Sequence, residues 1–373
     1  MKKKILLMII VNIAVVCTLI VFIEIAGQAA YYIKHGKFVF QADDYGYGEI
    51  FELHPFHAVR LKKNVRAESN GKTITTTSRH TRWTGAPEDD RGRIRLAVLG
   101  GSTAFGTNVT DSESWPALLQ SKLGDQFSVI NYGAPNFLSA EAIIQMAFIV
   151  PEAKPEFVIV YQGWNDIFQY HIKEFSPDYY DHGMDMYGKL SVPVNRDKTL
   201  FEKLNDLSAI ARAASKIKNM LPKKPAEEPC ETFDTPDPYV DRIYTRNLNT
   251  LKLLSEQTAS YTLFVPQVLN YHKFIENKDN ESCNWQASGH IKHRAFPVLM
   301  DRFNSFMREV CANGDPECIF VEAVLKVNWE PDDFVDWGHF SKKGGEKFAD
   351  VLSREITSKI KEVKSQSDHR LVD

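Results

Sequence analysis

The hydrophobic pattern begins with one long apolar run that differs from everything after it. Three lysines at positions 2–4 precede an apolar stretch from Ile5 to Ile23. A helix needs about 20 apolar residues to span a bilayer. A secretory signal peptide is the alternative, since small residues at 27–30 offer a cleavage point, but its apolar core is normally only about 7 to 15 residues long. We therefore expect a transmembrane anchor at residues 5–25 behind a cytoplasmic tip at residues 1–4.

The lysine cluster also predicts an orientation. By the positive-inside rule it keeps the N-terminus in the cytoplasm, although Lys34 and Lys37 reduce the charge asymmetry. The body of the chain is exported whether the apolar run is an anchor or a signal peptide. We expect a single-pass membrane protein whose main domain is periplasmic or extracellular.

After residue 93, short apolar runs alternate with helical patterns. The runs that predict strands lie at residues 95–100, 127–132, 157–161, 261–266 and 318–322. Helical patterns lie at residues 115–123, 139–150, 239–260 and 297–311, and a last one begins near residue 343. This alternation is typical of an α/β fold with a parallel sheet.

Two polar segments interrupt the alternation. Residues 170–237, rich in Tyr, Pro and charge, and residues 270–290 are interpreted as insertions, the first of which could cover or flank a site. Residues 26–93 are irregular and predict a linker with a small lead-in element. The main domain is therefore predicted at 94–362, followed by a polar tail at 363–373.

Charge excludes one class of partner. The chain of 373 residues has 45 Lys and Arg against 48 Asp and Glu, and its formal net charge is -3. Nucleic-acid-binding proteins usually carry a strong basic field, so we expect no nucleic-acid partner.

The cysteines fit an exported domain. Cys17 lies in the apolar run, and Cys230, Cys283, Cys311 and Cys318 remain for the rest of the chain. A Cys311–Cys318 disulfide is favoured because the two residues flank a short loop, and it would leave Cys230 to pair with Cys283. Four cysteines allow three connectivities, and unpaired thiols are the alternative. The chain has no CxxC motif or Cys/His cluster, so we expect no metal.

The first loop with candidate chemistry is Gly100-Gly101-Ser102-Thr103. Loops that follow parallel strands meet at the carboxyl edge of the sheet, where ligands bind. This loop places a hydroxyl at the start of a helix, where backbone N–H groups favour a developing negative charge. Ser102 is a candidate nucleophile, and a helix N-cap is its alternative role.

Two further loops offer hydrogen-bond donors. Gly133 can present its backbone N–H to an oxyanion, although a strand can also simply end in glycine. Asn165 offers a side-chain amide directly after a buried strand, and turn formation is its alternative role. Together with the N–H of Ser102 they would form an oxyanion hole with three donors.

The last loop pairs a carboxylate with an imidazole. Asp336 precedes His339 by three residues, just before the final helix. An aspartate can fix the tautomer of a histidine so that its other ring nitrogen faces a hydroxyl. Asp332 and Asp333 are alternative partners for His339.

In order and spacing, these loops resemble the SGNH (GDSL-like) hydrolases, a family named for Ser, Gly, Asn and His in separate blocks. The matching blocks are Gly100-Gly101-Ser102, Gly133, Gly163-Trp164-Asn165-Asp166 and Asp336-Trp337-Gly338-His339. The resemblance covers about residues 94–360 and implies a three-layer, flavodoxin-like fold. It implies that Ser102 is the nucleophile, that Gly133 and Asn165 are oxyanion donors, and that Asp336 and His339 act as a pair. The family's first block often has Asp before the Ser, whereas position 101 is Gly, which leaves the local hydrogen bonding open.

The leading hypothesis is an exported esterase that forms an acyl-enzyme on Ser102 and needs no metal or organic cofactor. Acetyl groups on envelope polysaccharides and acyl chains of lipids are candidate substrates. An acyltransferase would use the same triad and pass the acyl group to a sugar held near residues 170–237. A non-catalytic binding protein could also keep this fold. The intact set of Ser102, Asn165, Asp336 and His339 favours an enzyme.

Overall fold

The computed structural model describes residues 2–36, 38–41, 50–54, 57, 59–69, 71–171, 200–220, 236–276, 291, 293–312 and 315–370. The chain forms two compact units. The smaller comprises Met1–Gly48 with Pro193–Pro229, and the larger comprises Glu49–Val192 with Cys230–Asp373.

The larger unit is built on a five-stranded parallel sheet. Across the sheet the strands are β6 (Phe127–Asn131), β5 (Ile94–Gly100), β7 (Phe157–Tyr161), β8 (Tyr261–Phe264) and β9 (Cys318–Phe320). Every residue of β6 and β7 is buried, as expected where both faces of a sheet are covered. Counted along the chain the strand order is 2-1-3-4-5, which is the flavodoxin-like order. The predicted fold class is confirmed.

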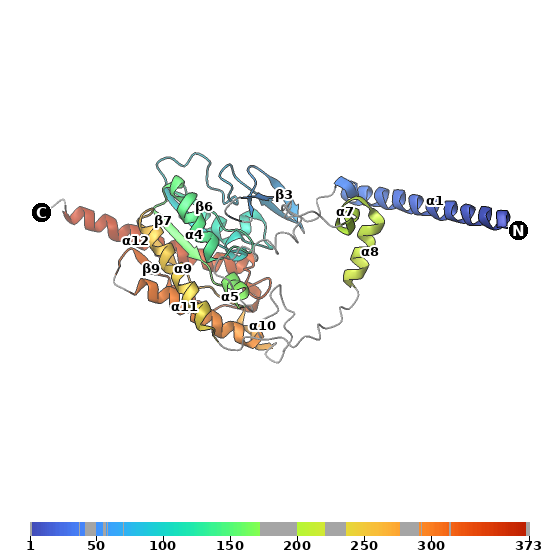
Figure 1. Ribbon diagram of the computed structural model, residues 1–373. Helices are drawn as coiled ribbons and strands as arrows, with labels where there is room; N and C mark the ends of the chain where they lie inside the picture. The colour runs from blue at the N-terminus through green and yellow to red at the C-terminus, as the bar shows by residue number, and fades with distance from the viewer. Residues whose placement is uncertain are drawn as a thin grey trace. The chain divides into compact units, whose positions relative to one another are not determined.

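Helices cover both faces of the sheet (Figure 1). One face carries α4 (Ser139–Phe148), α9 (Pro238–Glu256) and α11 (Phe296–Cys311). The other carries α3 (Trp115–Leu123) and α12 (Lys342–Arg370). Strand β5 supplies both layers, since Ala97 and Leu99 join the first hydrophobic cluster and Leu96 and Val98 join the second.

Shorter elements complete the larger unit. Among the described residues, the short helices are α2 (Ser102–Phe105), α5 (Trp164–Tyr170) and α10 (Tyr271–Glu276). Single 3-10 turns are η2 (Asp111–Glu113), η3 (Val150–Ala153), η4 (His293–Ala295), η5 (Glu322–Lys326) and η6 (Pro331–Asp333). The sequence did not predict α10, which lies in the second expected insertion.

The lead-in segment, residues 50–93, belongs to the larger unit. It contains two antiparallel pairs, β1 (Phe51–Leu53) with β2 (Val59–Leu61) and β3 (Arg66–Ser69) with β4 (Lys72–Thr75). Its backbone also joins the sheet unit, because Arg82 N donates to the carbonyl of Asn131 at 3.0 Å. The compact unit therefore begins well before residue 94.

A buried arginine ties the lead-in segment to the loop that follows α2. The side chain of Arg82 is fully buried. Its guanidinium donates to the carbonyls of Phe105, Gly106 and Val109 at 2.7, 2.5 and 2.8 Å. Asp111 lies 3.4 Å from its Nε and balances the charge. A buried cation is tolerated when acceptors and an opposite charge surround it, and the three carbonyls and Asp111 provide both for Arg82.

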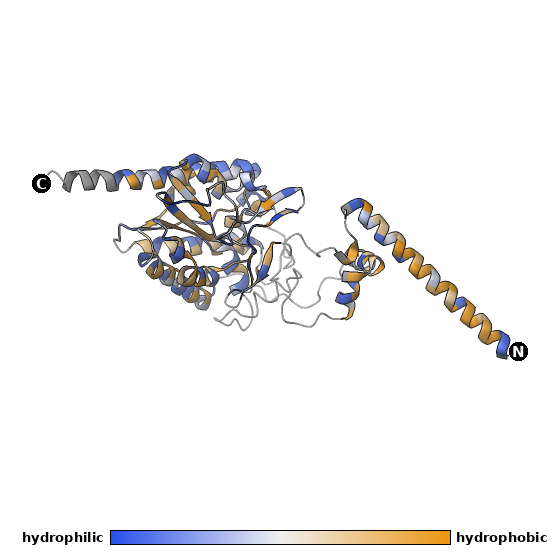
Figure 2. Cartoon of the chain, turned by 90° about the horizontal axis from the view of Figure 1, so that it is seen from above, coloured by the Kyte–Doolittle hydropathy of each residue, from blue (hydrophilic) through white to orange (hydrophobic). Residues whose placement is uncertain are grey.

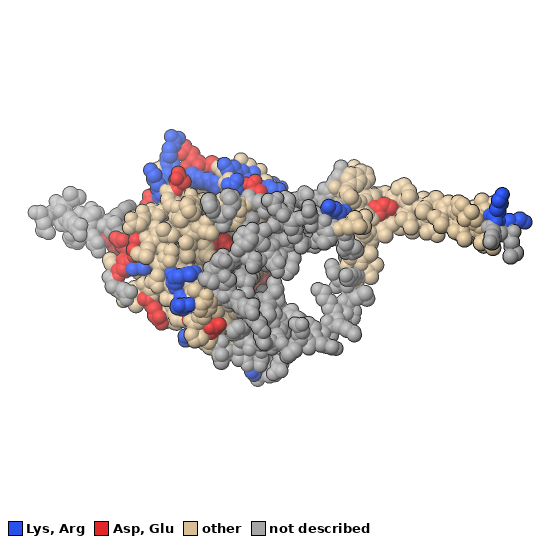
Figure 3. All heavy atoms as spheres, in the orientation of Figure 1, with Lys and Arg blue, Asp and Glu red and all other residues tan. Residues whose placement is uncertain are grey.

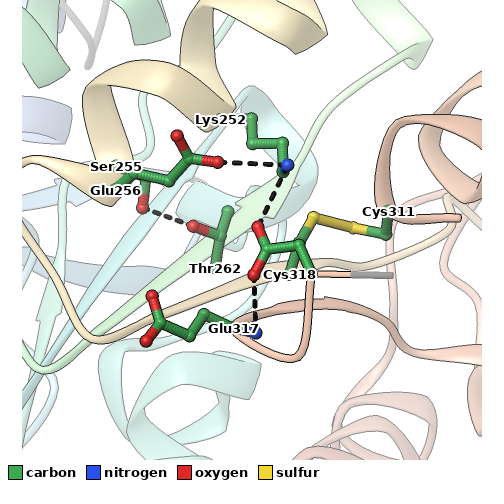
Figure 4. Close-up of a disulfide and its surroundings, with 8 residues drawn as sticks. Lys252, Ser255, Glu256, Thr262, Cys311, Glu317 and Cys318 are labelled. Atoms are coloured by element: carbon green, nitrogen blue, oxygen red, sulfur yellow. Dashed lines mark hydrogen bonds and ion pairs between the residues drawn. A yellow bond between two sulfur atoms is a disulfide. The ribbon is translucent and has the colours of Figure 1, made fainter. Parts of the chain in front are cut away.

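The disulfide Cys311–Cys318 joins the end of α11 to the start of β9 (Figure 4). Beside it, Lys252 contacts Glu256 and Asp315 at 3.1 and 3.0 Å. The predicted Cys311–Cys318 pair is therefore present. The proposed partners Cys230 and Cys283 lie outside the described residues.

The smaller unit contains α1 (Lys2–His35), η1 (Val39–Gln41), α7 (Leu200–Leu207) and α8 (Ala209–Met220). Hydrophobic residues run along α1, and Lys side chains gather at its N-terminal end (Figures 2 and 3). Among the described helices it is the one long and apolar enough to cross a membrane. The same length and composition are compatible with a signal sequence.

Part of the first insertion packs on α1. Glu24 accepts hydrogen bonds from Ala209 N at 2.7 Å, Ile210 N at 3.1 Å and Ser208 Oγ at 2.7 Å. The carboxylate thus caps the N-terminus of α8, where free N–H groups require acceptors. Residues 200–220 of the insertion expected at 170–237 therefore form helices in the same unit as α1.

We predict that Arg82→Leu lowers the free energy of unfolding by about 3 to 5 kcal/mol, because Asp111 and three carbonyls lose their buried donor. Chemical denaturation of the full chain in detergent measures the change. Arg91, which pairs with Asp89 on the surface, is the matched control. Arg91→Leu should leave the midpoint nearly unchanged, and an equal effect of both substitutions would contradict the role given to Arg82.

Candidate active site

The structure brings three predicted residues into one hydrogen-bonded row. His339 Nε2 lies 2.8 Å from Ser102 Oγ, and His339 Nδ1 lies 2.7 Å from Asp336 Oδ2. Ser102 is the first residue of α2, directly after β5, and Asp336 and His339 lie in the loop before α12. The helix N-cap is Gly101, so the hydroxyl of Ser102 faces His339 and does not cap the helix.

The carboxylate of Asp336 is held by its own loop. Its Oδ1 accepts from the backbone N–H groups of Gly338 at 3.0 Å and His339 at 2.9 Å. Burial acts to raise the pKa of Asp336, but the hydrogen bonds and charge of His339 and the two N–H groups lower it to about 2. An ionised carboxylate can only accept, so His339 donates from Nδ1 and leaves Nε2 to accept from Ser102.

The other two candidate acids have different partners. Asp333 is fully buried and bonds Lys347 Nζ at 2.6 Å, while Asp332 bonds Lys343 Nζ at 2.9 Å. With Glu330 they form a described group of acids close enough to hold a cation, and Lys343 and Lys347 form ion pairs with this group. Asp336 is therefore the partner of His339.

Asn270, which was not predicted from the sequence, supports the loop of Asp336 and His339 by hydrogen bonds to its backbone. It follows β8 and is buried. Its backbone N donates to the carbonyl of Trp337 at 2.9 Å, and its Nδ2 donates to that of Asp336 at 3.2 Å. The sequence offered one signal for Asn270. It is a polar residue that follows a buried strand, at the edge of the sheet where Ser102 and Asn165 lie.

Asn165 lies beside the turn that carries Ser102. A Cβ at Gly101 would come within 2.2 Å of Asn165 Nδ2. That amide donates one hydrogen bond to the carbonyl of Phe137 at 2.9 Å. Glycine at position 101 therefore allows the amide to approach the turn before Ser102, which accounts for the Gly-Gly-Ser form of this block. Among the described residues Phe137 is the one acceptor seen for this amide, so its second N–H can serve another acceptor.

Gly133 fits closely against the same turn. A Cβ at this position would lie 2.8 Å from Phe105 N and 3.0 Å from the carbonyl carbon of Ala104. Its N–H donates to Asn131 Oδ1 at 2.9 Å. The glycine is thus near α2 as predicted, but its N–H already has an acceptor.

Asp166, the last residue of the third block, joins α5 to α4. It is fully buried and accepts from the N and Oγ of Ser139 at 2.9 and 2.5 Å. Burial raises the pKa of Asp166, and the hydrogen bonds from Ser139 act against that rise. The residue fixes the start of α5, on which Asn165 lies.

Comparison with known proteins gives a partial match. No family model matches the chain. Over 71 residues, or 19% of the chain, it is 31% identical to "Thioesterase 1/protease 1/lysophospholipase L1" of Escherichia coli strain K12. The protein of the same name from E. coli O6:H1 matches equally. The matched region spans about a third of the length of these curated relatives, at 34%.

Solved structures that resemble this one have low sequence identity. A lipase/acylhydrolase from Enterococcus faecalis is 14% identical, with a TM-score of 0.40, and the match covers 71% of this chain and 96% of that one. A mutant of Axe2, an acetyl-xylooligosaccharide esterase from Geobacillus, is 14% identical, with a TM-score of 0.39 and coverage of 71% and 95%.

We predict that Asp336→Asn destabilises the protein less at low pH than near neutrality. The pKa of Asp336 is about 2, below the ordinary value of an aspartate, so its ionised form stabilises the folded state. That contribution is complete above about pH 4 and is lost as the pH falls toward 2. Thermal unfolding at about pH 5 and about pH 3 measures it. A difference in melting temperature between variant and parent that stays constant or widens on acidification would contradict this assignment.

Proposed function

We propose that this chain is a membrane-anchored serine ester hydrolase of the SGNH type, in which Ser102, His339 and Asp336 form the catalytic triad. The hydrogen-bonded row from Asp336 through His339 to Ser102 Oγ carries the proposal. A serine is a weak nucleophile unless an adjacent base takes its proton, and His339 Nε2 is placed to do so.

In the proposed reaction, Ser102 Oγ attacks the carbonyl carbon of an acyl ester while His339 takes the hydroxyl proton. The ionised Asp336 stabilises the imidazolium that forms. His339 then passes the proton to the leaving alcohol oxygen, which leaves an acyl-enzyme on Ser102. A water molecule, deprotonated by His339, hydrolyses this intermediate and restores the serine.

The negative charge that develops on the substrate oxygen needs donors. The second N–H of the Asn165 amide, which none of the described residues accepts, lies beside Gly101 and is the first donor. The backbone N–H groups of Ser102 and Gly133 complete the proposed oxyanion hole. Gly133 N–H donates to Asn131 Oδ1 in the structure, so it must be shared with the substrate or released to it. Each such donor contributes about 2.7 to 4 kcal/mol to transition-state stabilisation.

The proposed location is the membrane, with α1 as the anchor and the larger unit on the non-cytoplasmic side. Helix α1 is long and apolar enough to span a membrane, and Lys3 and Lys4 precede the apolar run. We assign the anchor to residues 5–25 and place the larger unit outside the cytoplasm. The Cys311–Cys318 disulfide supports export, because such bonds persist in oxidising compartments.

The substrate class proposed is an acyl ester, including O-acetyl groups on envelope polysaccharides and acyl chains of lipids. The names of the E. coli relatives refer to thioester and lysophospholipid cleavage, and both reactions transfer an acyl group to water. An acyl group on a membrane lipid or envelope polysaccharide would be within reach of an anchored enzyme.

We predict that Ser102→Ala lowers the rate of ester hydrolysis by about three to six orders of magnitude, since the nucleophile is removed. The full chain in detergent is assayed with p-nitrophenyl acetate and with longer acyl esters. Ser305→Ala, which removes an exposed hydroxyl from α11, is the matched control and should leave the rate unchanged.

Equal activity of the parent and Ser102→Ala would overturn the assignment of the nucleophile. An inert parent across the whole acyl series would overturn ester hydrolysis itself. Within an active series, preference for acetyl or for long chains separates polysaccharide deacetylation from lipid cleavage.

We also predict that Asn270→Ala lowers kcat by about tenfold to hundredfold with little change in KM, because the carbonyl of Asp336 loses its Nδ2 donor and the loop that carries His339 is held less firmly. Steady-state kinetics with p-nitrophenyl acetate measure both constants. Asn249→Ala on the exposed face of α9 is the control. A change in KM alone would argue against a role in positioning His339.

A further inference from the structure

A cavity of about 280 Å³ lies in the larger unit, where the lead-in segment meets β6 and α4. His54, His57 and Arg60 line it from the lead-in segment, and Tyr132, Phe137 and Gln145 line it from the sheet side. Its described lining residues include no member of the Ser102–His339–Asp336 row. The volume suits one small ring rather than an extended chain.

His57 is a buried polar group in the wall of this cavity. Its exposed fraction is 3%, and none of the described residues hydrogen-bonds either of its ring nitrogens. The ring stacks on His54 at 4.6 Å and packs against Phe137 at 5.5 Å, between centroids. A buried polar atom without a partner costs about 1 to 3 kcal/mol, so it calls for an explanation.

The ring of His57 is neutral at physiological pH. Burial, together with the nearby His54 and Arg60, lowers its pKa to about 3. A neutral imidazole carries one donor and one acceptor nitrogen. A ligand that satisfies both nitrogens must therefore both accept and donate.

Gln145 adds a second requirement. Its Nε2 donates to the carbonyl of Tyr132 at 2.9 Å, while its buried Oε1 accepts from none of the described residues. This oxygen needs a ligand that donates. Carboxylate and phosphate groups mainly accept at neutral pH, whereas hydroxyl groups donate and accept.

Arg79 and His80 also line the cavity, and both have partners within the unit. Arg79 forms an ion pair with Asp90, and His80 Nδ1 lies 2.7 Å from the carbonyl oxygen of Leu61. The remaining wall is apolar and comprises Leu61, Ala134, Phe137, Phe148 and Ile149. Arg60 also lines it and pairs with Glu52 at 2.6 Å. Apolar carbons next to a few convergent hydrogen-bonding groups match a ring with C–H faces and hydroxyl edges.

We propose that this cavity is a binding site for a single saccharide ring, whose hydroxyl groups bond His57 and Gln145 and whose C–H face packs on Phe137. The site is separate from the triad and does not depend on the proposed hydrolase function. Phe137 also contacts the triad side, since its carbonyl accepts from Asn165. A bound saccharide would thus lie against the residue that holds an oxyanion donor.

The test uses the full chain in nanodiscs, with Ser102→Ala to prevent turnover. Saturation-transfer NMR measures binding of glucose, N-acetylglucosamine and galacturonic acid, with inorganic phosphate as a competitor. We expect at least one sugar to bind and phosphate not to displace it. His57→Phe keeps the ring but removes both nitrogens, and it should weaken binding by about tenfold or more.

Two further variants complete the design. Gln145→Leu removes the acceptor independently of His57 and should also weaken binding. His272→Phe, at an exposed histidine on α10, is the matched control and should bind normally. Absence of binding by all three sugars, undiminished binding by both cavity variants, or displacement by phosphate would overturn the proposal. Because Ser102 is absent throughout, these outcomes are independent of whether the chain hydrolyses esters.

Discussion

The site depends on how one partly buried carboxylate obtains its hydrogen-bond donors. Asp336 receives two of them from the backbone of its own loop, Gly338 N and His339 N. Those bonds fix the loop so that the ring of His339 faces the carboxylate with Nδ1 and Ser102 with Nε2. Without the backbone donors, the pKa of Asp336 would be higher because burial raises it. The hydrogen bond between Asp336 and the imidazole of His339 would then be weaker. The row is thus set by the conformation of a single loop, and Asn270 fixes that loop to the end of β8.

Glycines, which have no side chain, allow the groups of the candidate site to approach one another. At Gly101, Gly133 and Gly338 an added Cβ would lie 2.2, 2.8 and 2.4 Å from a neighbouring atom. The neighbours are the Asn165 amide, the backbone of Phe105 and the ring of Trp164, all close to Ser102 or His339. Any larger residue would move one of these groups by more than hydrogen-bond geometry tolerates. Glycine serves here for close approach and not for flexibility.

Much of this arrangement could be predicted from the sequence. The strands β5 to β9 are short apolar runs, and parallel strands place their following loops at one edge, so Ser102, Asn165 and the Asp336–His339 loop were expected to converge. The bond from Gly133 N to Asn131 and the burial of Arg82 could not be predicted, because they depend on contacts between surfaces formed only in the folded chain. For the same reason helices α7 and α8 were predicted only as part of a polar insertion. The packing of α8 on α1 depends on Glu24, which is far away in sequence.

The lead-in segment lies in the same compact unit as the domain that the sequence predicts from residue 94. The sequence pattern marks residue 94 as the start of the first sheet strand. The carbonyls of Phe105, Gly106 and Val109, however, accept hydrogen bonds from Arg82, which precedes that strand. Those carbonyls belong to the end of α2 and the loop beyond it, so the helix that begins at Ser102 is fixed by a residue outside the predicted domain. The same segment contributes His57 to the cavity, whose other wall includes Phe137, the acceptor for Asn165. The lead-in segment therefore contacts the end of α2 and the loop after it through Arg82, and it contacts Phe137, the acceptor for Asn165, through His57.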